Sequence, residues 1–454
     1  MSETSGAPGS NPRTGEDARS PVERFLGLFT EVRAGEAALV LALALNVFLL
    51  LAAYYLVKPV REALILSLDG GAEIKSYAAA GQAVLLLGVV PFYGWLAGQL
   101  NRKRLINGVT LFICACLVGF YLLIRGGLAV AVPFYLWVGI YNVMIPAQFW
   151  SFANDLYTPE SGKRLFVIVA FGASIGAVAG GILAGRLIHL VGVEQLLLVA
   201  AGLLAVSLLI TNWADARSRR RDLPAAGRQA APGPVPEEGL GKSDAFALVV
   251  RNRYLLLIGV MMLVFNWVNT NGEYILGRLV KEAAVDRLDG AVSVGQFIGG
   301  FYADYFTAVN IVGMLLQLFV VSRVLKYLGV GVAVCVLPVL ALLGSLAMAL
   351  VPVLGIVRVM KIAENSTDYS LQNTVRQVLF LPTTRAEKYK AKQAIDTFFV
   401  RCGDMLSAAL VFVGTALLAL PTRDFAIVNV VLSAAWIVLA VMIGRRHKAL
   451  VADR

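Results

Sequence analysis

The sequence predicts an all-α integral membrane protein with twelve transmembrane helices in two six-helix halves. The chain of 454 residues is 58% hydrophobic and only 15% charged, whereas soluble domains are about a quarter charged. Apolar stretches of roughly 20 residues, the length of a membrane-spanning helix, recur along almost the whole chain. A backbone in lipid must satisfy its own hydrogen bonds, and a helix does so internally.

Twelve apolar stretches are candidate crossings. They cover residues 37–57, 77–97, 105–124, 130–150, 165–189, 193–213, 254–271, 310–325, 330–351, 355–381, 394–420 and 424–443. The eighth crossing has two candidate starts. Residues 277–290 are typical of an outside loop or an interfacial helix, and a crossing can also begin near Val294.

The crossings divide the chain into five regions. Residues 1–35 are polar and rich in glycine, serine and proline, so we expect a disordered N-terminus. Residues 214–253 form a basic, proline-rich linker between two six-helix bundles, 36–213 and 254–444, and residues 445–454 form a tail. We find no cleavable signal peptide, so the first crossing is expected to serve as the insertion signal.

Basic residues set the expected orientation. They gather in the linker and in loops on one side of a twelve-crossing protein, at residues 101–104, 163–164, 323–326, 385–392 and 445–446. The positive-inside rule makes this side cytoplasmic, which puts both termini of an inner-membrane protein in the cytoplasm. The net charge of +11 therefore reflects membrane topology and not nucleic-acid binding.

The cysteines and histidines indicate no metal or cofactor site. Cys114 and Cys116 point to different faces of one helix, and Cys335 and Cys402 lie in apolar sequence. The two histidines are far apart in the chain. No GxxxxGK[ST] phosphate loop occurs, so we expect neither an ATP-driven pump nor an enzyme.

Charged residues follow the first crossing without ending its apolar character. The segment YYLVKPVREALIL contains Lys58, Arg61 and Glu62. Snorkelling to the lipid headgroups explains Lys58 alone at least as well as a binding role. Arg61 and Glu62 have apolar residues on both sides, which indicates the rim of a site for a charged molecule.

The tenth crossing carries a polar stripe. Its charged and amide side chains recur every three or four residues and so share one helix face: Arg358, Lys361, Asn365, Asp368, Gln372 and Arg376. A charge at the centre of a membrane helix costs about 2.5–3.5 kcal/mol, so the stripe must face water, protein or substrate. The alternative, an amphipathic helix on the membrane surface, would break the twelve-helix parity.

Three further crossings hold polar residues. Asn154 and Asp155 follow an aromatic run in the fourth, although Asp155 could instead cap its helix or pair with a nearby lysine. In the seventh, Glu273 follows three asparagines and lies either in a cavity wall or at the outer surface. In the eleventh, Asp396 and Arg401 interrupt apolar sequence, and a buried structural pair is the alternative for Arg401.

Basic side chains predominate among these candidates, which predicts a central cavity for an anion of more than one charge. Arginine presents a fork that matches phosphate or carboxylate. The basic candidates come from both halves: Arg61, Arg358, Lys361, Arg376, Lys390, Lys392 and Arg401. Acidic side chains would hold these bases in place when the site is empty: Glu62, Asp155, Glu273 and Asp396.

An internal repeat relates the two halves. A shift of 227 residues superposes like residues of the fifth and eleventh crossings: Lys163 on Lys390, Phe171 on Phe398 and Gly176 on Gly403. Parallel six-helix repeats with a substrate site midway between them are the plan of the major facilitator superfamily. The segment GWLAGQLNRKR loosely resembles that superfamily's loop between helices two and three.

Three segments resemble the nucleotide transporter family of ATP/ADP translocases from plastids and obligate intracellular bacteria. DYSLQNTVRQVLFLPTTRAEKYKAKQAID resembles its YSL run, the basic residue seven positions after the Tyr, a PL-type turn, K-x-K-x-K and AID. VREALIL resembles its K/R-D/E-x-L segment, and FWSFANDL resembles its FW-x-FAN run. The matches come in family order.

This resemblance implies a carrier of nucleotides, or of a related phosphorylated anion, that works by alternating access. Arg61, Arg376 and Lys390 or Lys392 would hold phosphates, and an aromatic residue such as Tyr369 would stack a base. Two alternatives remain: a proton-coupled carrier of another organic anion or drug, and a membrane sensor or assembly protein that transports nothing. We expect a monomer in the bilayer.

Overall fold

The computed structural model describes residues 21–26, 30–33, 35–222, 242–286, 293–384 and 387–452. Most of the expected disordered N-terminus and residues 223–241 of the expected linker lie outside these ranges. All regular structure within them is helical. Nine helices of the described chain are long and apolar enough to cross a membrane, so the protein is a multi-pass membrane protein.

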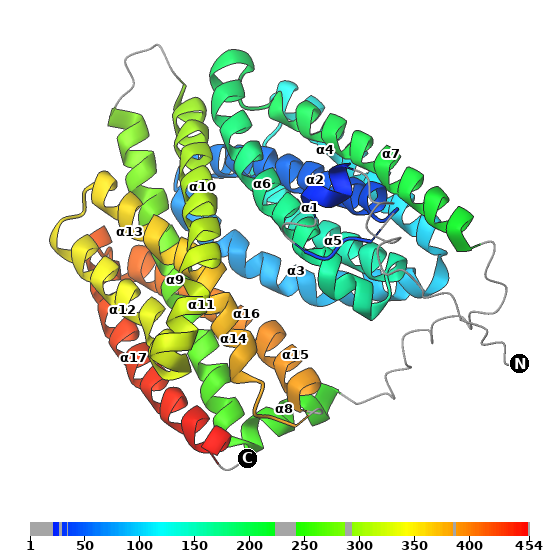
Figure 1. Ribbon diagram of the computed structural model, residues 1–454. Helices are drawn as coiled ribbons and strands as arrows, with labels where there is room; N and C mark the ends of the chain where they lie inside the picture. The colour runs from blue at the N-terminus through cyan, green and yellow to red at the C-terminus, as the bar shows by residue number, and fades with distance from the viewer. Residues whose placement is uncertain are drawn as a thin grey trace, which may run out of the picture.

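The first half of the chain forms a bundle of long helices (Figure 1). A short helix, α1 (Pro21–Leu26), precedes it. The long helices are α2 (Ala37–Leu66), α3 (Gly71–Gln99), α4 (Arg102–Arg125), α5 (Ala131–Leu156), α6 (Pro159–Val191) and α7 (Leu196–Asp222). Each corresponds to one expected crossing of this half.

The second half forms a similar bundle beside the first (Figure 1). Its first helices are α8 (Lys242–Arg251), α9 (Arg253–Asp286), α10 (Val294–Phe319), α11 (Val321–Arg323) and α12 (Gly329–Leu350). Its last helices are α13 (Leu354–Thr367), α14 (Asn373–Leu379), α15 (Lys392–Ala394), α16 (Val400–Phe412) and α17 (Thr422–Ala452). Helix α17 continues through most of the expected tail.

Helix α10 begins at Val294, the earlier of the two starts that the sequence allows, and not at residue 310. Ser293 and Gln296 form a capping box, in which each side chain accepts a hydrogen bond from the other residue's backbone. This cap satisfies amide groups at the helix start. Helix α9 runs on to Asp286, so residues 277–286 are helical.

The tenth expected crossing is a helix with an internal irregularity. A π-helical turn, Asp368–Gln372, separates α13 from α14. Helix α13 packs between α10 and α12, and Lys361 is fully buried. The segment therefore packs against other helices of its half, unlike an amphipathic helix that lies alone on a membrane surface.

Glycines allow the closest helix packing in each half. An added Cβ at Gly176 of α6 would overlap the backbone of Phe48 in α2, which shows that these helices nearly touch. At Gly403 of α16, a Cβ would lie 2.7 Å from the carbonyl oxygen of Leu263 in α9. The two glycines that the internal repeat superposes therefore have equivalent packing roles.

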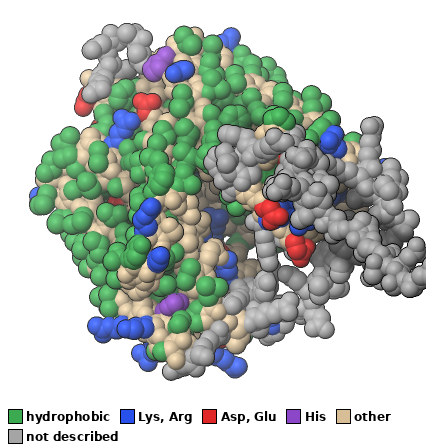
Figure 2. All heavy atoms as spheres, in the orientation of Figure 1, with side chains coloured by type: hydrophobic (Ala, Val, Ile, Leu, Met, Phe, Trp, Pro, Cys, Tyr) green, Lys and Arg blue, Asp and Glu red, His purple; other side chains and the backbone are tan. Residues whose placement is uncertain are grey.

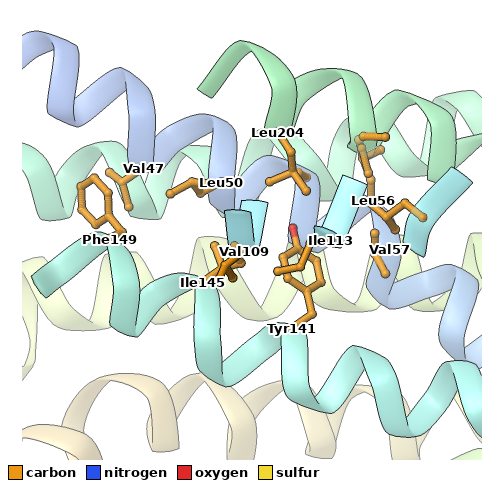
Figure 3. Close-up of a cluster of buried hydrophobic side chains, with 14 of the residues drawn as sticks. Val47, Leu50, Leu56, Val57, Val109, Ile113, Tyr141, Ile145, Phe149 and Leu204 are labelled. Carbon is orange, nitrogen blue, oxygen red and sulfur yellow. The ribbon is translucent and has the colours of Figure 1, made fainter. Parts of the chain in front are cut away.

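The core of the first bundle is a layer of apolar side chains between its helices. Figure 3 shows Leu50 of α2, Ile113 of α4, Tyr141 of α5 and Leu204 of α7 directed toward one another. All four are buried. This packing fixes α2, which carries the charged segment Lys58–Glu62 at its far end.

The two halves join where α2 and α9 end and α3 and α10 begin, which we term the sealed end. Tyr274 of α9 donates a hydrogen bond to Glu73 of α3 (2.9 Å), and Lys281 donates to the carbonyl oxygen of Leu68. Among the described residues, both ion pairs between the halves link α3 to α9 at or near this end. The sealed end therefore closes one side of the space between the bundles.

Candidate functional site

Charged side chains from both halves surround a cavity of about 250 Å³ next to the sealed end. Its walls come from α2, α3 and α5 of the first half and from α9, α10, α13 and α16 of the second. Figure 2 shows a hollow between the bundles with lysine and arginine side chains at its edge. We term this space the central cavity.

The first half contributes a compact ion cluster. Arg61 donates from its Nε to Glu62 Oε1 (3.0 Å), and Lys75 Nζ lies 2.7 Å from Glu62 Oε2. Glu62 is almost fully buried, so these two cations compensate a carboxylate that water does not reach. The Arg61 guanidinium also lies over the Tyr135 ring, 4.7 Å from its centroid.

The second half contributes a matching cluster around Lys361. Its Nζ lies 3.0 Å from Glu364 Oε2 and 3.7 Å from Glu273 Oε1, and it donates to Asn269 (3.1 Å). Asn365 donates to the same Glu273 oxygen (3.1 Å). The Lys361 side chain is 0% exposed, and the carboxylates of Glu364 and Glu273 compensate its charge.

One contact links these clusters across the interface. Lys75 Nζ of α3 lies 3.9 Å from Glu273 Oε2 of α9. Because Lys75 also contacts Glu62, and Glu273 also contacts Lys361, an alternating chain of charges runs from one half to the other. Relative movement of the halves at this point must separate charges.

Helix α16 contributes a further ion pair to the cavity wall. Arg401 of α16 contacts Asp404 Oδ2 at 3.3 Å, one helical turn away. Asp404 also accepts hydrogen bonds from Asn266 (2.7 Å) and Thr270 (2.9 Å) of α9. Asp404 is therefore well satisfied without the guanidinium, which remains partly exposed to the cavity.

Lys58 differs from the other cavity lysine. Its ammonium lies 3.8 Å from the centroid of the Phe306 ring and 5.4 Å from that of Tyr55. No carboxylate of the described chain lies within ion-pair distance of it, although the residue is only 8% exposed. Lys58 therefore faces the central cavity and does not snorkel away from it.

The structure brings half of the sequence-predicted site residues together. Six line the central cavity: Lys58, Arg61, Glu62, Glu273, Tyr369 and Arg401. Lys361 adjoins it through its contacts with Glu273. Glu273 lies in the cavity wall and not at the outer surface.

The other seven predicted residues lie elsewhere. Asn154 and Asp155 are exposed at the end of α5, where Asp155 lies 3.4 Å from Arg102. Arg358 lies over the Phe301 ring, 5.1 Å from its centroid. The rest surround the ends of α14 and α15, away from the sealed end: Arg376, Lys390, Lys392 and Asp396.

Other cavity residues were absent from the predicted site, above all Lys75, Tyr135, Asp368 and Asp404. The expected second crossing begins at residue 77, which leaves Lys75 in a loop, whereas α3 begins at Gly71. The lone lysine in GAEIKSYAAAG is thus inside the helix. Tyr135 gave no signal, because an aromatic residue in an apolar helix is indistinguishable from a packing residue.

Comparisons with known proteins agree with the motifs. No family model matches the chain. An ADP,ATP carrier protein 1 from Chlamydia pneumoniae is 23% identical over 348 residues, which cover 67% of this chain and 64% of that protein. Its counterpart from Chlamydia trachomatis is 21% identical over 299 residues, or 58% of this chain and 54% of that protein. The chain thus spans less than two thirds of the length of these relatives.

Solved structures share the fold. The nucleoside transporter NupG superposes with a TM-score of 0.60 at 15% sequence identity, covering 91% of this chain and 98% of that one. An identity this low establishes the architecture and not the substrate. The motif-based resemblance is therefore confirmed: this chain is similar in sequence to ADP,ATP carrier proteins, and it shares the fold of the nucleoside transporter NupG.

Proposed function

We propose that the protein is a secondary transporter that moves a nucleotide, or a related phosphorylated anion, across the inner membrane by alternating access. The observation that carries this proposal is the central cavity between the halves. It combines cations from both bundles, Arg61 and Lys75 from one and Arg401 from the other, with aromatic walls. Guanidinium and ammonium groups suit phosphate, and aromatic rings suit a base.

The proposal assigns the membrane arrangement as well. Within the described ranges, nine helices qualify as crossings on length and composition, and α5, α10 and the α13–α14 segment pack beside them. Twelve crossings with both termini in the cytoplasm would put the sealed end on the outer side. The central cavity would then face the cytoplasm in this conformation, and the outward-facing state would require the sealed end to open.

The residues around the ends of α14 and α15 have a separate role in this proposal. Arg376, Lys390 and Lys392 lie on the cytoplasmic side of the central cavity under the assigned orientation. Basic groups at the mouth of a cavity raise the local concentration of an anion and speed its entry. They would guide the substrate, whereas the cations of the central cavity would hold it.

Uptake into proteoliposomes tests the proposal. The purified full chain should take up labelled nucleoside mono-, di- or triphosphates, and unlabelled nucleotide inside should accelerate uptake if the carrier exchanges its substrates. A pH gradient should do so instead if transport is proton-coupled. No uptake of any nucleotide under either condition would contradict the proposal and favour the sensor alternative.

A matched pair of variants ties transport to the central cavity. Arg61→Gln should lower initial uptake by about tenfold or more, because a hydrogen bond to a charged group contributes about 1.5–3 kcal/mol. Arg125→Gln makes the same change at an exposed position at the end of α4. It should retain uptake within about twofold. Equal losses of uptake in both variants would contradict a role of the central cavity in transport.

A further inference from the structure

The ionisable side chains that line the central cavity cancel in formal charge. Four are cationic: Lys58, Arg61, Lys75 and Arg401. Four are acidic: Glu62, Glu273, Asp368 and Asp404. The adjoining residues Lys361 and Glu364 also cancel each other. The cavity is therefore neutral overall, although basic residues predominate among the candidates chosen from the sequence.

Most of these charges already have partners. Arg61 and Lys75 contact Glu62, Lys75 also contacts Glu273, and Arg401 contacts Asp404. Two lining groups form no ion pair with any described residue. One is the Lys58 ammonium and the other is the Asp368 carboxylate. The cavity thus presents to an incoming molecule one cation and one anion that have no direct ion-pair partner among the described residues.

This arrangement disfavours a highly charged anion. Lys58 can neutralise one negative charge without disturbing any other contact. Each further phosphate charge would have to share Arg61 with Glu62 or Arg401 with Asp404, because the lining carries no surplus positive charge. A charge that is not fully compensated in a poorly hydrated site costs free energy, so affinity should fall as phosphates are added.

The surroundings of the two groups indicate what they bind. Lys58 is nearly buried among Phe306, Tyr55 and Tyr54, so its charge is poorly hydrated and is favourable only with an anion beside it. Asp368 accepts hydrogen bonds and attracts amino groups, and its neighbour Tyr369 supplies an aromatic surface in the same wall. Carboxylates accept from the exocyclic amino group of cytosine.

We infer that the substrate carries little negative charge for a nucleotide and presents one phosphate to Lys58 and one amino group to Asp368. This inference rests on the proposed nucleotide transport. Within that class it selects a nucleoside monophosphate with an amino-bearing base, such as cytidine monophosphate, over the corresponding triphosphate.

Three ligands test the two parts of the inference separately. Binding to the purified full chain in nanodiscs should be about tenfold tighter for cytidine monophosphate than for cytidine triphosphate, because of charge. Cytidine monophosphate should also bind at least about fivefold more tightly than uridine monophosphate, which has an oxo group in place of the amino group. Tighter binding of the triphosphate would overturn the charge argument while leaving nucleotide transport standing.

Two variants assign the roles. Lys58→Met should lower the affinity for cytidine and uridine monophosphate by about tenfold each and leave the ratio of the two affinities unchanged. Lys103→Met, at the exposed start of α4, is the control and should leave both affinities unchanged. Asp368→Asn should bring the cytidine-to-uridine ratio to about one, because an amide can also donate to the uracil oxygen. An unchanged ratio in Asp368→Asn would refute its role. Failure of all nucleotides to bind or move would instead refute the proposed function itself.

Discussion

Lys75 of α3 and Glu273 of α9 form an ion pair across the interface between the two halves, with 3.9 Å between Nζ and Oε2. Each residue also contacts an opposite charge in its own half, Glu62 for Lys75 and Lys361 for Glu273. The contact therefore belongs to the closed arrangement of the halves and not to the folding of either one. Under the proposed alternating access, this contact would have to break when the sealed end opens.

Glu273→Gln should favour opening of the sealed end. Neither lysine loses its last carboxylate, because Lys75 retains Glu62 and Lys361 retains Glu364. If the lost charge contributes about 1 kcal/mol, the open population rises about fivefold. The measurement is labelling of an Ala79→Cys probe in the cavity wall by an impermeant maleimide added outside.

The control for that experiment is Glu282→Gln, on the same helix but facing Arg278 at an exposed position. It should leave probe labelling unchanged. The four native cysteines are half-buried, and labelling without the probe gives their background. Equal labelling in the two glutamine variants would show that the interfacial ion pair does not hold the sealed end closed.

Gly176→Leu and Gly403→Leu should each destabilise the protein. A side chain at either position meets the backbone of the neighbouring helix, and overpacking costs about 1–3 kcal/mol or more. Gly202→Leu is the matched control, because a Cβ there has no neighbour within 4 Å. Thermal unfolding of detergent-solubilised protein should show a lower midpoint for the first two variants only. An unshifted midpoint would contradict the close packing of α2 with α6 and of α9 with α16.

Removal of the Lys361 charge should destabilise the protein, and a second substitution should restore part of the lost stability. Lys361→Met leaves Glu364 and Glu273 facing each other without their shared cation, and loss of one partner of a buried pair costs about 3–5 kcal/mol. Adding Glu364→Gln removes one of the two carboxylates and should recover part of the stability. Lys448→Met, at an exposed position, should be neutral. If the double variant is no more stable than Lys361→Met, charge compensation is not the cause.

Arg376→Gln should slow substrate entry without weakening binding in the central cavity. Arg376 does not line the cavity, and its guanidinium donates to Asn373 at 3.2 Å. Guidance by charge depends on ionic strength, so the variant should lower uptake at low salt and match the unchanged protein at high salt. Equilibrium binding of nucleotide should stay within about twofold. A large loss of affinity would make Arg376 a direct ligand.

The helices could be predicted from the sequence because bilayer-length apolar runs are a strong signal. Each expected crossing has a helical counterpart, and the largest boundary error is the start of α10. There, the polar residues between Glu273 and Asn310 resemble a loop in hydropathy, although residues 274–286 form the end of α9 and residues 293–309 form a capped helix start. Local capping chemistry, and not hydropathy, marks that boundary.

The candidate site was predictable only in part, because hydropathy does not show where an irregular turn changes the direction in which the side chains of a helix point. The stripe from Arg358 to Arg376 assumes a regular helix, but the π-helical turn Asp368–Gln372 inserts an extra residue in one turn. Side chains after the turn are rotated relative to those before it. Asp368 accordingly lines the cavity, whereas Arg376 does not.

A map of the protein with bound cytidine monophosphate, obtained by cryo-electron microscopy, tests the proposed location of the substrate most directly. We predict density between the two bundles, with the phosphate at Lys58 and the base near Asp368 and Tyr369. Density confined to Arg376, Lys390 and Lys392, with an empty space between the bundles, would contradict the assignment of the central cavity as the transport site.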